Sequence, residues 1–437
     1  MFPLLNQTIE TAMAVLFPGT MLPRAEEFDF LQRRGITVRR GEPPDVDGWS
    51  LDLSHPAWGE AKLVATPGRQ RPPRFLIDFA PYLTDQDREA VASCGVVLSL
   101  HHKGERGHIL RDRKLALRYA RAVMGEDGRG AIDQDSCRIW RPRHLDDELE
   151  HDADLDVESL YAIHLVSDDE DASHVLWAHT HGLGEVGGFD FDVVEPHDYF
   201  LGPGSDLFRT IAFRVLEGAL QPHTPVFEVG WPLPPAGLVP AAQFDRRAAP
   251  QEAALREDPQ GVHRQRRSVI CEPRAGLLGR WRRPRRCQWL TEQPEADAVF
   301  HISTAATQVM AERAHHTVGV LRRLLDRFAA YDLPVLVKLG YTVDGGDPTD
   351  REHLWFEVHR IGEHRVEATL ASEPLAIARM QAGDRGWHDL ALLSDWVVVT
   401  PAGWITPRQM AAVHILDEQP KLLKQLRASK RSKHHRA

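Results

Sequence analysis

A proline-rich segment near the middle of the chain places the strongest limit on how it can fold. Residues 231–240 read Trp-Pro-Leu-Pro-Pro-Ala-Gly-Leu-Val-Pro. Proline fixes φ and lacks the backbone N–H that helices and sheet ladders use, so an extended connector is expected here. Residues 231–300, rich in Pro and Arg, are predicted to form this connector. With 437 residues, the chain is long enough for two or three domains.

Residues 1–230 show the mixture of short apolar runs and amphipathic stretches that is typical of a mixed α/β region. Helices are predicted at 112–124, which Gly125 can end in a left-handed conformation, and at 206–220. Thr84 and Asp87 suggest a capped helix start. The region is expected to form one domain, or two subdomains with a boundary near 130–150. Strands are predicted where short apolar runs are bounded by Pro, Gly or charges: 49–53, 62–65, 75–79, 96–100, 160–166 and 174–177.

Residues 301–420 are predicted to form a long helix and a small β-rich domain. The helix has one apolar stripe with spacings of three and four residues: Met310, Ala314, Thr317, Leu321, Leu324 and Phe328. Residues 421–437 contain seven Lys or Arg and no acid, which indicates a solvated basic tail. The fold class expected for the whole chain is α+β. Four apolar runs after the helix predict strands: 333–343, 354–361, 365–370 and 396–400.

Composition limits the classes of function. Because 63 Asp and Glu outweigh 53 Lys and Arg, the formal charge is −10, which argues against general nucleic-acid binding. The four cysteines form no Cys-x-x-Cys pair, so neither a disulfide scaffold nor a zinc ribbon is indicated. The apolar N-terminus lacks the pattern of a signal peptide, and no run reaches the ~18 apolar residues of a spanning helix. A cytoplasmic, globular protein without membrane attachment is expected.

A His-x-His pair is the sharpest chemical signal. His179 and His181 follow an apolar run, and side chains two apart in a strand point to the same face. Two imidazoles and a carboxylate are a common ligand set for catalytic zinc, with Asp192 as the candidate carboxylate. The spacing resembles that of the JAMM metalloprotease motif. Gly182 and Phe189 stand where that motif has Pro and Ser, and no upstream Glu can be singled out as the base.

The same residues also have a structural interpretation. The two histidines can hydrogen-bond at a strand end, with Asp190 and Asp192 on the exposed side of a Phe-Asp-Phe-Asp strand. Among 23 histidines, chance His-x-His pairs are expected. We therefore predict no cofactor from this motif, and zinc is the metal that the alternative would require.

An arginine-rich segment is a candidate anion-binding site. Its arginines present planar guanidinium groups suited to phosphates, and Trp281 and Trp289 lie among them. The alternative is that they form a solvated loop or pair inside the fold with the acidic residues 146–158. The candidate residues are Arg264, Arg266, Arg267, Arg282 and Arg283.

The C-terminal region resembles a bacterial family, the domain of unknown function 2314. Four blocks that carry the resemblance occur in the family's order: residues 352–358, 368–374, 383–384 and 393–396. The upstream region resembles the domain of unknown function 4026, at residues 17–20, 138–140, 151–156, 177–183 and 188–192. Both families are uncharacterised, so the resemblance implies no catalytic residue.

Tryptophans in the β-rich region suggest two roles. Trp355 and Trp396 lie in predicted strands and are expected to face one small core. Alternatively, Trp355, Trp387 or Trp404 is exposed and anchors a partner, because interface hot spots are enriched in Trp. The leading hypothesis is a non-enzymatic, protein-binding protein whose partner and oligomeric state are unknown. The alternatives are a metal-dependent hydrolase with His179, His181 and Asp192, and anion or nucleic-acid binding through residues 264–286.

Overall fold

The chain forms two compact units that are not continuous in sequence. The first comprises residues 1–81, 88–145 and 157–303, and the second comprises residues 82–87, 146–156 and 304–437. Both units contain helices and sheets, which confirms the predicted α+β fold class. Of the described helices, none combines the length and the apolar character needed to cross a membrane. The computed structural model describes residues 2–44, 47–67, 71–78, 80, 82–105, 107–167, 175–194, 203–224, 226–231, 235–240, 267–272, 299–300, 304–347 and 349–424.

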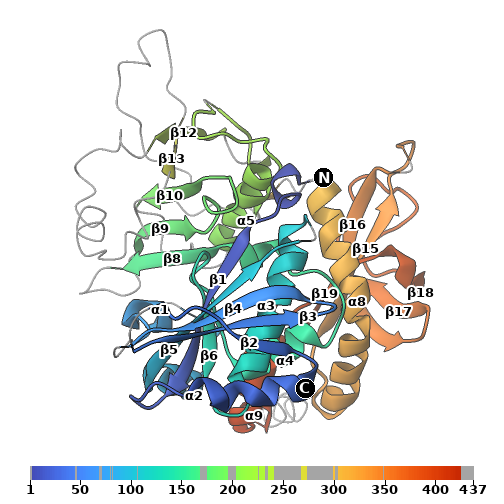
Figure 1. Cartoon of the computed structure of the whole chain (residues 1–437). Coiled ribbons are helices and arrows are strands. Elements are labelled where there is room, and N and C mark those ends of the chain that lie inside the picture. The colour runs from blue at the N-terminus through green and yellow to red at the C-terminus, as the bar shows by residue number, and fades with distance from the viewer. Residues whose placement is uncertain are drawn as a thin grey trace, which may run out of the picture. The chain divides into compact units, whose positions relative to one another are not determined.

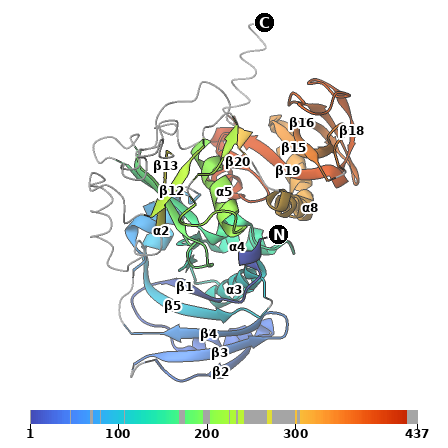
Figure 2. The same cartoon turned by 90° about the horizontal axis from the view of Figure 1, so that it is seen from above.

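An antiparallel sheet of seven strands forms one part of the first unit, in the order β2-β3-β4-β5-β1-β6-β7. Leu16 of β1 and Leu98 of β5, two central strands, are fully buried. Figure 2 shows these strands side by side. The strands are β1 (Glu10–Pro18), β2 (Thr37–Arg40), β3 (Trp49–His55), β4 (Gly59–Ala65), β5 (Cys94–Lys103), β6 (Gly130–Asp133) and β7 (Ile139–Trp140).

Helix α3 (Ile109–Met124) packs on this sheet against β1. Ala116, Leu117, Ala120 and Val123 are fully buried at spacings of one helical turn, so the amphipathic pattern that predicted the helix also defines its packing face. Gly125 ends the helix at the predicted residue with a positive φ of 54°, but its ψ of −128° differs from that of the left-handed helical conformation that was expected.

Two short helices precede β5. At the start of α2 (Asp85–Ala92), Thr84 Oγ1 accepts the N–H of Asp87, and the Asp87 carboxylate accepts the N–H of Thr84, each at 3.1 Å. This reciprocal cap confirms the predicted helix start. The strand predicted at 75–79 is wrong, because Arg74–Asp78 forms helix α1. A five-residue apolar run does not distinguish the two structures, and Pro73 directly before it suits a helix start.

A second sheet of the first unit has the order β12-β13-β10-β9-β8. Only β10 and β13 pair in parallel; the other neighbours are antiparallel. Figure 1 shows β8, β9 and β10 as adjacent green strands. The elements are β8 (Ala162–Ser167), β9 (Val175–His181), β10 (Asp190–Val194), β12 (Gly237–Pro240) and β13 (Arg267–Cys271). The unit also contains α4 (Pro142–Leu149, which continues into the second unit), α5 (Pro203–Leu216), and the pair β11 (Gly230–Trp231) and β14 (Val299–Phe300).

The second unit is an antiparallel six-stranded sheet with one long helix. Helix α8 (Thr304–Phe328) contains the predicted apolar stripe and packs against β19 (Figure 1). Its core includes Leu321, Leu324 and Phe328 from α8 and Phe356 and Trp396 from the sheet. Helix α9 (Ala411–Glu418) follows the sheet. The strand order is β18 (Arg385–Asp389), β17 (Arg365–Leu370), β16 (Arg351–Ile361), β15 (Val335–Thr342), β19 (Leu393–Thr400) and β20 (Gly403–Ile405).

A buried arginine joins three segments of the second unit. The Arg313 guanidinium of α8 donates to both carboxylate oxygens of Glu148, at 3.0 and 2.5 Å, and to the carbonyl oxygens of Asp154 and Pro407. Residues 146–156 thus pack with α8 although more than 150 positions separate them in the chain. A second ion pair, between Arg323 of the same helix and Glu150, is exposed.

These two pairs predict different losses of stability. Glu148→Ala leaves the Arg313 charge buried without its carboxylate, so we expect the free energy of unfolding around α8 to fall by about 3–5 kcal/mol. Glu150→Ala is the matched control and should cost less than about 1 kcal/mol. Native-state hydrogen exchange of α8 peptides measures both changes locally. Equal protection in the two variants would contradict the assigned role of the buried pair.

Candidate metal centre

Three buried histidines gather on two neighbouring strands of the first unit. They are His179 and His181 of β9 and His164 of β8, whose exposed fractions are 1%, 1% and 5%. One possible ligand nitrogen from each ring lies within 4.8 Å of the other two. The structure therefore brings the predicted His-x-His pair together with a third imidazole that the sequence analysis did not single out.

Strand register explains why these rings meet. Side chains alternate along β9, so His179 and His181 share a face. His164 lies directly opposite His179 in the β8–β9 pair, and residues directly opposite project to the same face. Gly182 then ends β9 with φ 110°, and a Cβ at this position would lie 2.2 Å from the Leu160 carbonyl oxygen. Proline, which the metalloprotease motif has here, cannot adopt that φ.

The ring geometry suits convergent ligands. The Nε2 atoms of His179 and His181 are 3.1 Å apart. Two nitrogens bound to one tetrahedral zinc, with Zn–N bonds of ~2.0–2.1 Å, lie roughly 3.3–3.4 Å apart. The His164 ring centroid lies 4.6 Å from that of His181 and 5.4 Å from that of His179. Three histidines are the zinc ligands of carbonic anhydrase, which shows that such a set suffices.

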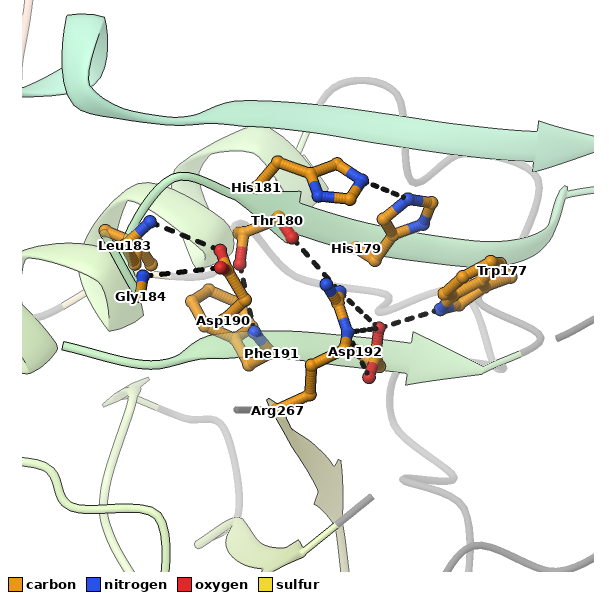
Figure 3. A network of polar contacts seen from close by, with 10 residues as sticks. All are labelled: Trp177, His179, Thr180, His181, Leu183, Gly184, Asp190, Phe191, Asp192 and Arg267. Carbon is orange, nitrogen blue, oxygen red and sulfur yellow. Dashed lines mark hydrogen bonds and ion pairs between the residues drawn. The ribbon is translucent and has the colours of Figure 1, made fainter. Parts of the chain in front are cut away.

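Asp192, the predicted third ligand, has other partners. It lies opposite His179 on β10, but Arg267 Nη2 of β13 donates to its Oδ1 at 2.7 Å. Trp177 Nε1 donates to the same oxygen at 2.9 Å (Figure 3). The Trp177 ring also stacks on His179, with centroids 3.8 Å apart. Among the described residues, the group that could hold a metal ion therefore contains the three imidazoles and not Asp192. Asp192 is linked to His179 through the stacked Trp177 ring.

Asp190 holds the turn that follows β9. Its carboxylate accepts the N–H groups of Leu183 and Gly184, each at 3.3 Å (Figure 3). Burial raises the pKa of Asp190 to about 6, although Arg267 and these hydrogen bonds act in the opposite direction. Asp190 and Asp192 are both fully buried, so the alternative that placed them on an exposed face is wrong.

Among the candidate anion-binding residues, only Arg267 lies within the described ranges. It is buried, and it donates to Asp192 and to the Thr180 carbonyl oxygen at 3.0 Å. Arg267 therefore pairs inside the fold, as the alternative interpretation proposed, but with Asp192 and not with residues 146–158. Arg264, Arg266, Arg282 and Arg283 lie outside the described residues.

The three candidate tryptophans share one face of the six-stranded sheet. Trp396, expected to share a core with Trp355, is fully buried against α8, where its Nε1 donates to Thr317. Trp355 lies on the opposite face, half-buried beneath the Lys338 ammonium group. By the strand registers, Trp387 of β18 and Trp404 of β20 point to the same side as Trp355, and they are 50% and 66% exposed.

Part of the chain is similar to a known protein family. Residues 308–406 match a family described as "Uncharacterized protein conserved in bacteria (DUF2314)". This match supports the resemblance found at the C-terminus, and the upstream resemblance to domain 4026 stays a prediction. No curated protein and no solved structure matches the chain. The matched range lies in α8 and the six-stranded sheet, and it contains none of the three clustered histidines.

The pKa of Asp190 predicts a pH dependence. Its pKa is about 6 in the folded chain against an ordinary value of 3.8, so between these values the folded state binds more protons than the unfolded state. The contribution of Asp190 to stability must therefore decrease as the pH rises from about 4 to about 6. Asp190→Asn removes this titration.

Thermal unfolding of both proteins across pH 4–7 measures the effect. The melting temperature of Asp190→Asn relative to the wild type should rise through about pH 4–6 and then level off. The raised pKa of Asp135, also about 6, affects both curves equally and cancels in the difference. Parallel curves would show that Asp190 ionises normally.

Proposed function

We propose that this protein binds one transition-metal ion, with zinc as the leading candidate, through His164, His179 and His181. The observation that carries the proposal is the convergence of three buried imidazoles from adjacent strands, two of them with Nε2 atoms 3.1 Å apart. Because a metal ion accepts the lone pairs of several imidazoles at once, it gives the three buried rings a common partner.

A transition-metal ion such as zinc suits this ligand set better than calcium or magnesium. Imidazole nitrogen is a ligand for zinc, copper, iron and nickel, whereas calcium and magnesium prefer oxygen. Three protein ligands leave the fourth position of a tetrahedral zinc ion for water, as in catalytic sites. Metal-dependent hydrolysis is therefore the reaction that such a site would support. The ligand set proposed for it is now three histidines, because Asp192 is bound to Arg267.

The residues that pack against the proposed ligands support the same proposal. Ligating histidines in metal sites are usually oriented by further hydrogen bonds and packing. Here the Trp177 ring stacks on His179, and its indole N–H is held by Asp192, which Arg267 neutralises. This arrangement limits the rotation of one of the three rings before metal enters.

Elemental analysis of untagged protein tests the proposal. We expect close to one zinc per chain in the wild type and loss of zinc in His164→Ala, His179→Ala and His181→Ala. Competition against a chromophoric chelator should show that each variant binds zinc at least about 100-fold more weakly than the wild type. This loss exceeds the 10–100-fold that is typical when a residue that hydrogen-bonds to a metal ligand is removed.

His223→Ala is the matched control. His223 lies in the same unit and is exposed, so its loss should leave the zinc content unchanged. The His164 variant distinguishes the set of three histidines from the set of His179, His181 and Asp192, because only the first set requires His164. Metal-free wild-type protein that also fails to take up zinc in the competition assay would disprove the proposal.

Protein binding by the second unit is a separate candidate function. It is favoured by the two exposed tryptophans, Trp387 and Trp404, on a sheet face opposite α8. Tryptophan is enriched among residues that dominate interface energetics. This candidate does not depend on the metal centre.

Quantitative affinity capture tests this candidate. Proteins retained by the wild type should be lost with Trp404→Ala, because truncation of an anchoring tryptophan removes about 2 kcal/mol or more. Leu375→Ala is the control, since Leu375 is also exposed but lies outside the strands of the sheet. Equal capture by the wild type and both variants would contradict a binding role for Trp404.

A further inference from the structure

We infer that the edge strand β18 is a self-association site, at which a second copy of this chain pairs antiparallel to extend the six-stranded sheet. The inference rests on residues 385–389, which read Arg-Gly-Trp-His-Asp. The inference does not depend on the metal centre, because β18 belongs to the second unit and the three histidines belong to the first.

The backbone of β18 has a free hydrogen-bonding side. The Leu370 N–H donates to the Asp384 carbonyl oxygen and the Leu390 N–H to the His364 carbonyl oxygen, at 2.8 and 2.9 Å. The main-chain N–H and C=O groups of the even-numbered residues of the strand therefore face β17. The main-chain groups of Arg385, Trp387 and Asp389 must face away from it, because the two sides alternate in an antiparallel ladder. No described strand pairs with that side.

The strand is complementary to itself. In a two-fold antiparallel pair centred on Trp387, each Trp387 exchanges hydrogen bonds with its own counterpart. Arg385 then lies opposite Asp389 of the second copy, and Asp389 lies opposite its Arg385. Directly opposite residues project to the same face, so two ion pairs flank a pair of tryptophans.

The side chains are available for these contacts. Trp387 is 50% exposed, and the Arg385 side chain is 57% exposed. Arg385 already pairs with Glu367 on β17 at 2.8 Å, and its fork of five N–H donors can bind a second carboxylate. Asp389 uses Oδ1 to accept the N–H of Ala391 and keeps its other oxygen for the partner's Arg385.

Charge also selects the partner and its register. Charged residues on an edge strand normally prevent pairing with other chains. Here each flanking charge meets its opposite in a second copy, whereas a shift of two residues or a foreign strand leaves charges unmatched. A five-residue strand buries less than the ~1,600 Å² of a standard interface, so we expect dissociation in roughly the micromolar range.

Sedimentation of the full chain at increasing concentration, in the presence of a metal chelator, tests the inference. The wild type should form a reversible dimer. Arg385→Asp places two acidic pairs at the interface and Asp389→Arg places two basic pairs, so each variant should dimerise at least about tenfold more weakly. Arg351→Asp changes an exposed charge on β16, away from the edge, and should dimerise like the wild type.

Mixing the two edge variants gives the decisive result. In the mixed pair, the introduced acid faces the introduced arginine, and the remaining Asp389 faces the remaining Arg385. Association should therefore return in the mixture although each variant alone is impaired, which a misfolded variant cannot reproduce. A wild type that stays monomeric at every concentration, or edge variants that dimerise as well as the wild type, would overturn the inference.

Discussion

The buried ion pair between Asp192 and Arg267 is the interaction on which the second sheet of the first unit depends. Arg267 also binds the Thr180 carbonyl oxygen, and Asp192 also binds the Trp177 indole, so one pair connects β9, β10 and β13. Separating the partners would leave an uncompensated charge inside the protein, at a cost of about 3–5 kcal/mol. The pair also decides what neither residue can do. Asp192 is not a free carboxylate ligand, and Arg267 is not a free anion-binding group.

Local patterns predicted the parts of this chain whose structure is decided locally. The apolar stripe of residues 310–328 predicted α8, and the Thr84–Asp87 cap predicted the start of α2. The His-x-His pair was found because alternation within one strand places both rings on one face. His164 was not found, because its approach depends on the register of β8 against β9. A register shift of one residue would have turned its side chain to the other face.

Long-range pairing explains the other differences. The partner of Asp192 lies 75 residues away, and the partner of Arg313 lies 165 residues away. Sequence shows that such charges exist but not which of them become buried together. Trp355 and Trp396 show the same limit within one sheet. Both lie in predicted strands, but the pairing of β15 with β16 and β19 places Trp396 against α8 and Trp355 on the other side.

The two edges of the six-stranded sheet differ in a way that bears on association. β20 has three residues and pairs with β19 over only three residue pairs, next to a tight turn that contains Gly403 at φ 115°. Such a short edge offers few main-chain groups to another chain. β18 is longer, and its charges are placed symmetrically about Trp387. Charged residues protect an edge strand against pairing with other chains whatever their order along the strand. In β18, opposite charges stand at equal distances from a central tryptophan, so each charge meets its opposite when the strand pairs antiparallel with a second copy of itself. β18 is therefore the edge at which two copies of this chain would pair.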